Sequence, residues 1–562
     1  MLRRALIALS LANIFFLPAW REVLDPGPLF HCYHTKLCPV GAELLAVALN
    51  TTLLAAALFA GYELARRSGR PLLLRAAQAL FLVFFLLCLN AVRVQYRGLL
   101  LTGLTGTLGR AGALALGLAA LGLGAYALWR VGFPRLVRAA AAAALILSPF
   151  VFVAYGQALW QLVWYRSVVA ERGELARPQP AREGAARPRV FWLIFDELDY
   201  RLAFEQRPAG LALPEFDRLL AESLSAREAY PPGAFTIQVL PALLTGKLVA
   251  EAVETRPDDL NLRFHEESEW VGWRGRPNIF GRAREAGFNA GVAGWHHPYC
   301  RMFKQDLVRC SWGEDTFTEL GVVQRASVAG NMLRGARMSF FSVPALHRLV
   351  TPREEVFRHE SALLEEKSRK LSELVDNGRA LAADPQLQLV LVHLPIPHPP
   401  NFYDRASGRF AFDAPRSYLD SLALTDRTLG ELRREMEAAG LWDSTAVLVS
   451  SDHWWRAREV WAPVAGIPDN APYWNASDTA LVPAETDYRV PFILKLPGQR
   501  QATNYDPAFN TILSHDLVLG VLRGELKTPG EVAAWLDRHR SVGQSPYYHF
   551  ANPTAPNNIV RD

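Results

Sequence analysis

The chain has 562 residues, half of them apolar, and a formal net charge of only +5. This length allows three or four ordinary domains, and the slight charge, with no basic cluster, argues against a nucleic-acid partner. No internal repeat is visible.

Five apolar segments occupy the first 165 residues and predict an α-helical transmembrane domain. Several approach or exceed the roughly 20 residues that cross a bilayer core, and none has an acidic residue at its centre. A cleaved signal peptide is an alternative for the first segment, but no small-x-small cleavage site follows it. The segments are Ala5–Trp20, Val40–Tyr62, Ala76–Val92, Ala111–Trp129 and Ala139–Gln161.

The basic residues between these segments predict their orientation. With the amino terminus inside, the inner segments are richer in arginine than the outer ones, as the positive-inside rule requires. We therefore expect an integral protein of the cytoplasmic membrane whose large carboxy-terminal part is periplasmic or extracellular. The inner residues are Arg3, Arg4, Arg66, Arg67, Arg70, Arg75, Arg130, Arg135 and Arg138, and the outer ones are Arg21, Lys36, Arg93, Arg97 and Arg110.

Four cysteines fall on the outer side of this topology, where disulfides form. Cys32 and Cys38 lie in the first outer loop, and Cys300 and Cys310 lie in the large outer part. We expect each pair to be bonded. A zinc site built on Cys32, His34 and Cys38 is a lesser alternative, because a fourth ligand at standard spacing is missing.

Composition sets the remaining boundaries. Residues 1–165 form the transmembrane domain, and residues 166–189, rich in Arg, Pro, Ala and Gly, are expected to form a linker. A catalytic domain is expected over 190–544, followed by an extended tail over 545–562.

Two apolar runs in the large domain predict buried strands that end in acidic residues. Arg189–Phe195 is followed by Asp196 and Glu197, and 445–451 is followed by Asp452 and His453. Open α/β sheets gather their ligands at the carboxyl ends of strands. A mixed carboxylate and imidazole set suits Zn²⁺ or Mn²⁺ better than Ca²⁺, although Mg²⁺ and Ca²⁺ stay open.

Between these strands, the stretch 231–246 delivers Thr236 to the start of a short apolar helix. Unpaired backbone N–H groups and the helix dipole favour an alkoxide or a bound anion there, so Thr236 is a candidate nucleophile. Thr is also a common helix N-cap, which is the structural alternative.

From residue 190 to 520 the sequence resembles the sulfatase-like branch of the alkaline phosphatase superfamily. Thr236 stands ten residues before Gly246, where sulfatases carry their catalytic Cys or Ser. The resemblance implies an α/β fold with a sheet sandwiched by helices. Six matches occur in the family's order: 213–219, 236–246, 283–296, 393–398, 418–430 and 489–491.

Two departures indicate a particular branch. Ile237 to Leu240 do not provide the Cys/Ser-x-Pro-x-Arg motif from which formylglycine is made, and Gly294 replaces a lysine that helps hold sulfate in sulfatases. A threonine nucleophile beside these acids resembles lipoteichoic acid synthases and lipid A phosphoethanolamine transferases, which also have five spans before the domain.

The resemblance also implies roles for individual residues. Glu197, Asp452, His453 and the Thr236 oxygen are expected to bind the metal, with Asp196 as a further ligand or a supporting partner. His398 and His296 are expected to bind phosphoryl oxygens or to protonate the leaving group. Arg489 belongs to a late segment that closes the site and is expected to bind substrate. His393 is expected only to pack, and 460–488 to form either a lid or a surface loop.

Three function classes follow. The first is a phosphotransferase that moves a phosphoethanolamine or phosphoglycerol group from a membrane lipid, through Thr236, to an envelope glycan or lipid. The second is a hydrolase of phosphate or sulfate esters with the same fold, and the third is an inactive binding or scaffold protein. Together, Thr236, Glu197, Asp452 and His453 argue against the third class, and membrane tethering favours the first. The oligomeric state stays open.

Overall fold

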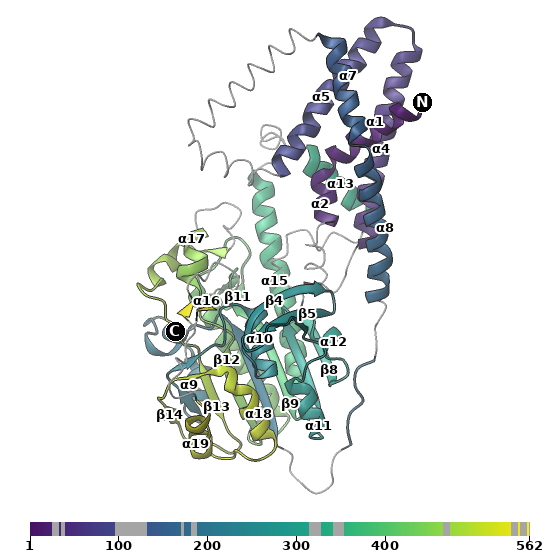
Figure 1. Ribbon diagram of the computed structural model, residues 1–562. Coiled ribbons are helices and arrows are strands. Elements are labelled where there is room, and N and C mark those ends of the chain that lie inside the picture. Colours follow the sequence, from purple (N-terminus) through teal and green to yellow (C-terminus); the bar gives the residue numbers. More distant parts are fainter. Residues whose placement is uncertain are drawn as a thin grey trace. The chain divides into compact units, whose positions relative to one another are not determined.

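The computed structural model describes residues 1–24, 33–34, 40–95, 132–169, 174–180, 188–313, 327–340, 353–464, 473–540, 549–550 and 559–560. The chain divides into two compact units, which we describe separately (Figure 1). The helical unit comprises Met1–Pro28, Leu37–Ala170 and Gly321–Glu355. The sheet unit comprises Leu29–Lys36, Glu171–Leu320 and Val356–Asp562. The expected single boundary near residue 165 therefore misses two segments: residues 29–36 precede it but group with the sheet unit, and residues 321–355 follow it but group with the helical unit.

The helical unit contains long apolar helices. Three stretches, Gly41–Arg67, Pro71–Val92 and Phe133–Val163, are long and apolar enough to cross a membrane. The first expected segment is divided between two shorter helices, and the fourth lies outside the described residues. The helices are α1 (Leu2–Phe15), α2 (Leu17–Leu24), α4 (Val40–Arg67), α5 (Pro71–Gln95), α7 (Phe133–Ile146), α8 (Pro149–Val169) and α13 (Val328–Phe340).

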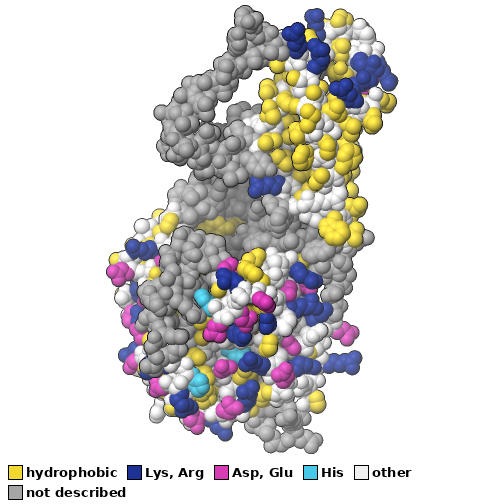
Figure 2. Space-filling model, in the orientation of Figure 1, with side chains coloured by type: hydrophobic (Ala, Val, Ile, Leu, Met, Phe, Trp, Pro, Cys, Tyr) yellow, Lys and Arg dark blue, Asp and Glu magenta, His cyan; other side chains and the backbone are white. Residues whose placement is uncertain are grey.

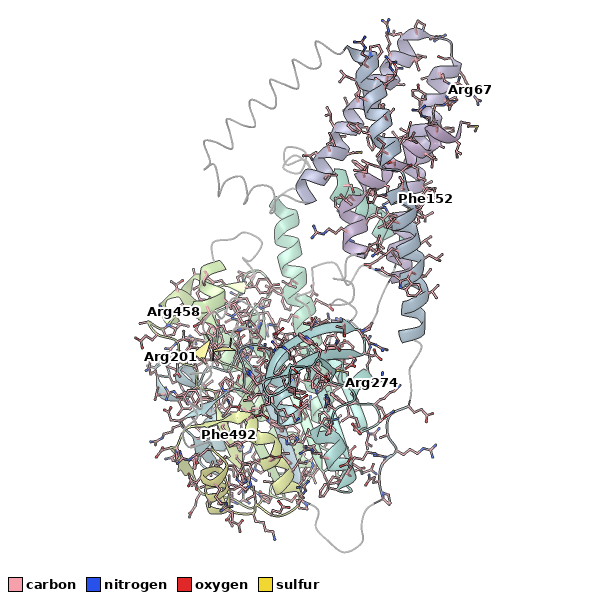
Figure 3. All side chains as sticks on the ribbon, in the orientation of Figure 1. Arg67, Phe152, Arg201, Arg274, Arg458 and Phe492 are labelled. Atoms are coloured by element: carbon pink, nitrogen blue, oxygen red, sulfur yellow. A yellow bond between two sulfur atoms is a disulfide. The ribbon has the colours of Figure 1, made fainter. Side chains whose placement is uncertain are left out.

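The outside of the helical unit is largely apolar. Figure 2 shows apolar side chains over its surface and basic side chains gathered at one end, where Figure 3 marks Arg67. Large apolar side chains such as Leu80, Phe152 and Trp160 are well exposed. Exposed apolar surface of this extent is what a bilayer-facing helix presents.

An eight-stranded sheet forms the centre of the sheet unit, in the order β14-β2-β13-β12-β1-β9-β7-β8. All of its strands run in the same direction except β13, which is antiparallel to both neighbours. The carboxyl ends of the other strands therefore lie along one edge. The strands are β14 (Thr503–Tyr505), β2 (Leu224–Ala226), β13 (Phe492–Lys495), β12 (Thr445–Ser451), β1 (Arg189–Asp196), β9 (Leu389–Pro397), β7 (Ala290–Trp295) and β8 (Leu307–Gly313).

Both faces of this sheet are covered, which explains the continuous apolar runs in the sequence. Along β1, Trp192 and Ile194 enter one apolar core, whereas Phe191, Leu193 and Phe195 enter the other. The first core is closed by α10 (Thr236–Thr245), α11 (Ile279–Glu285), α12 (Tyr299–Met302), α18 (Ser514–Leu522) and α19 (Pro529–His539). The second is closed by α9 (Pro214–Leu220), α15 (Arg353–Ala382) and α16 (Tyr418–Ala438).

Smaller strands complete the unit. A three-stranded sheet follows α10 and consists of β4 (Val249–Arg256), β5 (Asp259–Phe264) and β6 (Val271–Gly272). Two-stranded ladders join β3 (Ala229–Tyr230) to β15 (Phe509–Asn510), and β10 (Tyr403–Asp404) to β11 (Arg409–Phe410). In the expected tail, β16 (His549–Phe550) pairs with β17 (Ile559–Val560).

Part of the expected linker is bound to the sheet unit. The backbone N–H of Ala176 donates to the carbonyls of Lys304 and Leu307 at 2.9 and 3.0 Å. The N–H of Gln179 donates to Oδ1 of Asn289 at 2.9 Å. Residues 174–180 thus lie along the surface of the unit and do not act as a free tether.

Candidate active site

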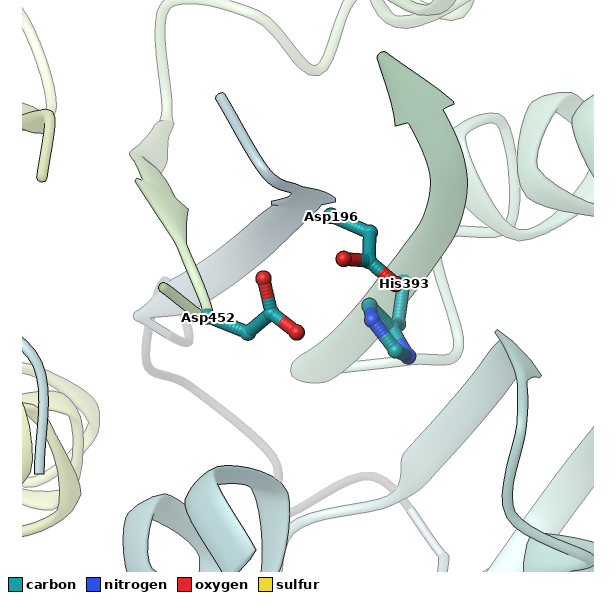
Figure 4. Close-up of side chains that lie close together, drawn as sticks. All are labelled: Asp196, His393 and Asp452. Atoms are coloured by element: carbon teal, nitrogen blue, oxygen red, sulfur yellow. The ribbon is translucent and has the colours of Figure 1, made fainter. Parts of the chain in front are cut away.

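Neighbouring strand ends bring two carboxylates and an imidazole together. Asp196 is the last residue of β1, and Asp452 directly follows β12, whose Ser451 pairs with Phe195. His393 lies on β9 and pairs with Ile194. Asp196, His393 and Asp452 are fully buried and face one another in Figure 4.

Thr236 adds a hydroxyl to this cluster from the first residue of α10. Its Oγ1 donates a hydrogen bond to Oδ2 of Asp452 at 2.7 Å, and Oδ2 of Asp196 lies 3.5 Å from the same oxygen. Nε2 of His453 lies 3.4 Å away. The N-cap position is occupied by Phe235. The hydroxyl of Thr236 is therefore directed to a carboxylate and does not cap the helix.

The cluster fits a divalent cation. One ligand atom from each of Asp196, His393 and Asp452 lies within 4.8 Å of the others. Among the described residues, Oδ1 of Asp196 and Nε2 of His393 are buried without a hydrogen-bond partner. A cation between them would satisfy both atoms, and the mixed nitrogen and oxygen set suits a transition metal such as Zn²⁺.

In His393 and in His453, the nitrogen that faces away from the cluster is hydrogen-bonded to a backbone carbonyl. Nδ1 of His393 lies 3.2 Å from the carbonyl of Trp295, and Nδ1 of His453 lies 3.1 Å from the carbonyl of Trp454. Because a carbonyl only accepts, Nδ1 carries the hydrogen in each ring. Nε2 is then free to act as a ligand or acceptor, the usual arrangement for metal-binding histidines.

His393 differs from its expected role of packing alone. Strand alternation puts His393 and His398 on opposite faces, because they are five residues apart. However, Phe195 pairs with Leu394 while the next residue, Asp196, pairs with Pro397. The two extra residues on β9 come after His393 and affect only the course of the chain toward His398. His393 itself pairs in register with Ile194, two residues before Asp196, so the side chains of His393 and Asp196 lie on the same face of the sheet.

Burial controls the acid–base properties of the cluster. Burial raises the pKa of Asp196 well above its usual value, and the neighbouring charges of Asp452 and Glu197 raise it further. Burial also raises the pKa of Asp452 to about 7, although the hydrogen bond from Thr236 opposes this. Desolvation lowers the pKa of His453 well below 6.5. Two buried acids that resist ionisation indicate a site that a bound cation would complete.

Glu197, the neighbour of Asp196, has other partners. Its Oε1 accepts from Nε of Arg456 at 2.7 Å, and its Oε2 accepts from Nε1 of Trp461 at 2.8 Å. Its backbone has a φ of 62°, which is unusual for a residue other than glycine. This left-handed residue changes the direction of the chain directly after Asp196. Asp196, not Glu197, has its carboxylate beside Thr236, so the contacts favour Asp196 for the ligand role that was expected of Glu197.

His398 and His296 lie at the ends of β9 and β7. The N–H of His398 donates to the carbonyl of Asp196 at 3.0 Å, and its Nδ1 lies 2.6 Å from the carbonyl of Pro399. Burial, with the nearby charges of Lys367 and Arg456, lowers the pKa of His398 well below 6.5. The His296 ring is centred 5.6 Å from the Trp295 ring. Their roles toward substrate stay predictions.

Arg489 is held in an ion-pair network. Its guanidinium contacts the carboxylates of Asp487, Glu205 and Glu228, and it lies over the ring of Tyr200. The hydrogen bonds that Arg489 donates to Asp487 raise the pKa of Arg489 above its usual value. Three acidic partners neutralise the charge that substrate binding would use, so this geometry favours a structural role. Its predicted substrate contact has no support from the described contacts.

A family model described as Sulfatase matches residues 188–523, more than half of the chain. The chain belongs to the sulfatase family. It is a sulfatase-like enzyme of the alkaline phosphatase superfamily. A search of curated proteins found no match.

A comparison with solved structures found several that are similar to this chain. A phosphonate monoester hydrolase from Silicibacter pomeroyi is 13% identical, with 66% of this chain and 82% of that chain covered and a TM-score of 0.39. A sulfatase from Pseudoalteromonas sp. is 14% identical over 61% and 69% of the two chains, with a TM-score of 0.37. An alkaline phosphatase superfamily protein from Vibrio parahaemolyticus is 13% identical over 62% and 71%, with a TM-score of 0.34.

Within this sulfatase fold, Gly294 has a clear structural reason. A Cβ atom at this position would lie 2.4 Å from Cε2 of Tyr299, so the tyrosine ring fills the space that a side chain would need. The hydroxyl of Tyr299 lies 3.3 Å from Nδ1 of His393. A lysine at position 294 is therefore incompatible with this packing.

Several residues at the sulfatase site were not identified from the sequence. Arg456 pairs with Glu197, and Nζ of Lys367 on α15 donates to the carbonyl of His398 at 2.5 Å. His297 approaches Thr236, as described below. The run Trp454–Arg456, directly after His453, was an available signal for Arg456. Lys367 lies within a long charged helix and carried no local signal.

The four cysteines that were expected to pair and the 460–488 segment lie partly within the described residues. Cys300 of α12 and Cys310 of β8 form a disulfide with a Cα–Cα distance of 5.6 Å. Cys32 and Cys38 lie outside the described residues. In the 460–488 segment, Trp461 reaches Glu197 and stacks on Tyr473 at 6.0 Å between ring centroids. At least this part of the segment borders the site.

Proposed function

We propose that this enzyme is a membrane-bound, metal-dependent phosphotransferase that moves a lipid headgroup through a covalent Thr236 intermediate. The transferred group is of the phosphoethanolamine or phosphoglycerol type, and the acceptor is an envelope glycan or lipid. The single observation that supports this most is the Thr236 hydroxyl, held 2.7 Å from Asp452 at the first residue of a helix.

In the first half-reaction, Oγ1 of Thr236 attacks the phosphorus of the lipid phosphodiester. Oδ2 of Asp452 is within hydrogen-bond distance of the Thr236 hydroxyl and takes its proton. A phosphorus–oxygen bond to Thr236 forms, and the bond to the diacylglycerol oxygen breaks. That leaving oxygen takes a proton from His296, one of the two histidines predicted for this role, because the lowered pKa of His398 leaves the His398 ring neutral.

The second half-reaction reverses these steps with a new partner. A hydroxyl of the acceptor attacks the phosphorus and loses its proton to the histidine that protonated the leaving oxygen in the first half-reaction. The bond to Thr236 breaks, and Oγ1 recovers a proton from Asp452. Each group is thereby returned to its starting state, as a covalent catalytic cycle requires.

Asp196, His393, Asp452 and His453 would hold the divalent cation next to the Thr236 oxygen. When bound, the cation would neutralise phosphoryl oxygens and lower the pKa of the attacking hydroxyl. Glu197, included among the expected ligands, would hold Arg456 beside Phe235, whose ring lies 5.2 Å from the guanidinium.

The apolar helices support a lipid donor. The three long apolar helices of the helical unit could anchor the enzyme in a membrane. Anchoring keeps the active site near phospholipid, which a soluble ester hydrolase does not need. In this proposal the sheet unit lies on the outer side of the cytoplasmic membrane, and nucleic acid is not a partner.

A hydrolase is the second candidate, and membership of the sulfatase family favours it. It would share the first half-reaction, with water as the attacking group in the second. A phosphate or sulfate ester would then be cleaved without an acceptor.

The test uses the purified full-length protein with vesicles of phosphatidylethanolamine or of phosphatidylglycerol. After trypsin digestion, the peptide 228–247 should carry the mass of the transferred headgroup, and fragmentation should locate it on Thr236 and not Thr245. Thr236→Ala should show no adduct. Diacylglycerol release without an adduct would overturn the covalent route, and headgroup release to water that added acceptor does not change would favour the hydrolase.

A further inference from the structure

Two residues from the amino-terminal part of the sequence belong to the sheet unit. Tyr33 and His34 lie in the segment Leu29–Lys36, between the sequences of α2 and α4, yet this segment groups with the sheet unit. Both side chains are fully buried. They contact residues more than 200 positions away, directly after β7 and in β4.

Tyr33 is linked to the nucleophile through one histidine. Its hydroxyl lies 2.8 Å from Nδ1 of His297, and Nε2 of His297 lies 3.3 Å from the backbone carbonyl of Thr236. The carbonyl only accepts, so Nε2 carries a hydrogen. In the neutral ring, Nδ1 is then an acceptor and the Tyr33 hydroxyl is its donor. Tyr33 thereby fixes both the tautomer and the orientation of His297.

His34 supports the neighbouring residue in the same turn. Its Nδ1 lies 2.8 Å from the carbonyl of His296, and its Nε2 lies 3.3 Å from Oε1 of Glu254 on β4. These two contacts use both ring nitrogens. The lesser alternative of a zinc site also needs Cys32 and Cys38, which lie outside the described residues, and the described contacts of His34 do not support it.

The turn that these residues hold is strained. His296 has a φ of 69°, and the N–H of His297 donates to the carbonyl of Trp295 at 2.8 Å, two residues back. This is a γ-turn of the rarer hand, which is a strained conformation for a residue other than glycine. Such a conformation persists only where surrounding contacts maintain it. His34 supplies one of these contacts, at the carbonyl of the strained residue His296.

We propose that Tyr33 and His34 are positioning residues of the active site: they hold the His296–His297 turn and, through His297, the backbone of Thr236. This proposal deepens the proposed function, because it assigns part of the catalytic geometry to a segment between two apolar helices. Neither residue touches the reacting atoms. Their loss should lower the rate of the chemical step while substrate binding is retained.

Matched variants of the full-length protein separate the individual contacts. An asparagine amide can replace Nδ1 of histidine, and a glutamine amide can replace Nε2. His34→Asn should therefore keep the hydrogen bond to His296, whereas His34→Gln should lose it. Tyr33→Phe removes only the hydroxyl. Tyr505→Phe is the control, because it also removes a buried hydroxyl, one bonded to Asp537 at 2.9 Å, in the same unit.

The first measurement does not depend on activity. Hydrogen–deuterium exchange of the backbone amides from Trp295 to Met302 should become faster in Tyr33→Phe and His34→Gln. It should stay at the wild-type rate in His34→Asn and Tyr505→Phe. Unchanged exchange in the first two variants would overturn the proposal, whatever reaction the enzyme catalyses.

The second measurement is the turnover of a chromogenic phosphodiester. Tyr33→Phe should lower kcat roughly tenfold to a hundredfold with little change in KM, the scale expected when a reacting group is slightly misplaced. His297→Asn keeps the hydrogen bond to the Tyr33 hydroxyl but loses the hydrogen bond to the carbonyl of Thr236. The double variant Tyr33→Phe/His297→Asn should therefore be no slower than His297→Asn alone. Additive losses would overturn the relay through His297. If Thr236→Ala retains the wild-type rate in the same assay, the proposed function fails instead.

Discussion

Nε of Arg456 donates to Oε1 of Glu197 at 2.7 Å, whereas the adjacent carboxylate of Asp196 has no arginine partner among the described residues and lies 3.7 Å from Nε2 of His453. The two neighbouring acids therefore have different surroundings. Asp196 lies beside Thr236 and Asp452, and Glu197 neutralises a buried arginine. This difference indicates which of them is the stronger candidate for a metal ligand.

We predict that Asp196→Asn removes most bound metal, whereas Glu197→Gln retains it. The asparagine loses a negative charge at the centre of the cluster. The glutamine instead weakens the buried pair with Arg456, and loss of charge from such a pair destabilises a fold by a few kcal/mol. Metal content by mass spectrometry and thermal unfolding of the two variants test this. Loss of metal from Glu197→Gln at unchanged stability would restore Glu197 as a ligand.

Metal affinity should fall as pH falls through about 7. The pKa of Asp452 is raised to about 7 by burial and that of Asp196 is raised as well, so the metal-free acids bind protons below this range. A metal must displace those protons, which weakens binding roughly tenfold per pH unit for each proton released. The low pKa of His453 keeps its ring neutral, so it adds no competition.

Titration calorimetry in buffers of different ionisation enthalpy would count the protons released. Release should be at least one at pH 6 and should decrease as pH rises. Affinity that is constant between pH 5.5 and 8 would contradict the burial of unneutralised acids at this site.

The sequence predicted the fold and the strand ends because their signals are local. A fully covered parallel sheet produces continuous apolar runs, and polar residues after β1 and β12 mark its functional edge. The same local reasoning cannot choose between Asp196 and Glu197, because the choice depends on a backbone change to a φ of 62°. It also fails for His393, because the sequence does not reveal the register of β9 on β1 that puts His393 on the same face as Asp196.

Long-range contacts account for the other omissions. Tyr33 and His297 are separated by 264 positions, and no periodicity connects them. The exchange of residues 29–36 and 321–355 between the two units is equally invisible to composition. In each case, tertiary packing decides which residues come together, and the local sequence pattern does not contain that information.

The orientation of the helical unit is testable with reporter fusions. The excess of arginine in the inner loops predicts that a reporter active only outside the cytoplasm is active after Gln161 and inactive after Gly69. Equal expression of both fusions is the necessary control. The reverse pattern of activity would end the proposed topology.

Removal of the Cys300–Cys310 disulfide should destabilise the sheet unit. The bond joins residues ten positions apart. Closing a short loop of this kind contributes about 3 kcal/mol in the chain-entropy description. The double Cys→Ser variant should therefore unfold at a lower temperature than the wild type, whereas Cys88→Ser, which changes a free buried thiol, serves as the control. Equal unfolding temperatures for wild type and double variant would contradict a structural role for the bond.

Thr236→Ala should abolish turnover while the fold and the remaining metal ligands persist. The substitution removes the oxygen that attacks phosphorus, and loss of a catalytic nucleophile costs several powers of ten in rate. Thr236→Ser should retain part of the activity, because a primary hydroxyl can perform the same attack. The matched control is Thr245→Ala in the same helix, whose buried hydroxyl lies away from the cluster: it donates to the carbonyl of Pro241 at 2.7 Å and accepts from the N–H of Lys247 at 3.4 Å. Steady-state rates with metal content measured on the same samples decide the outcome: near wild-type turnover by Thr236→Ala would show that this hydroxyl is not the nucleophile.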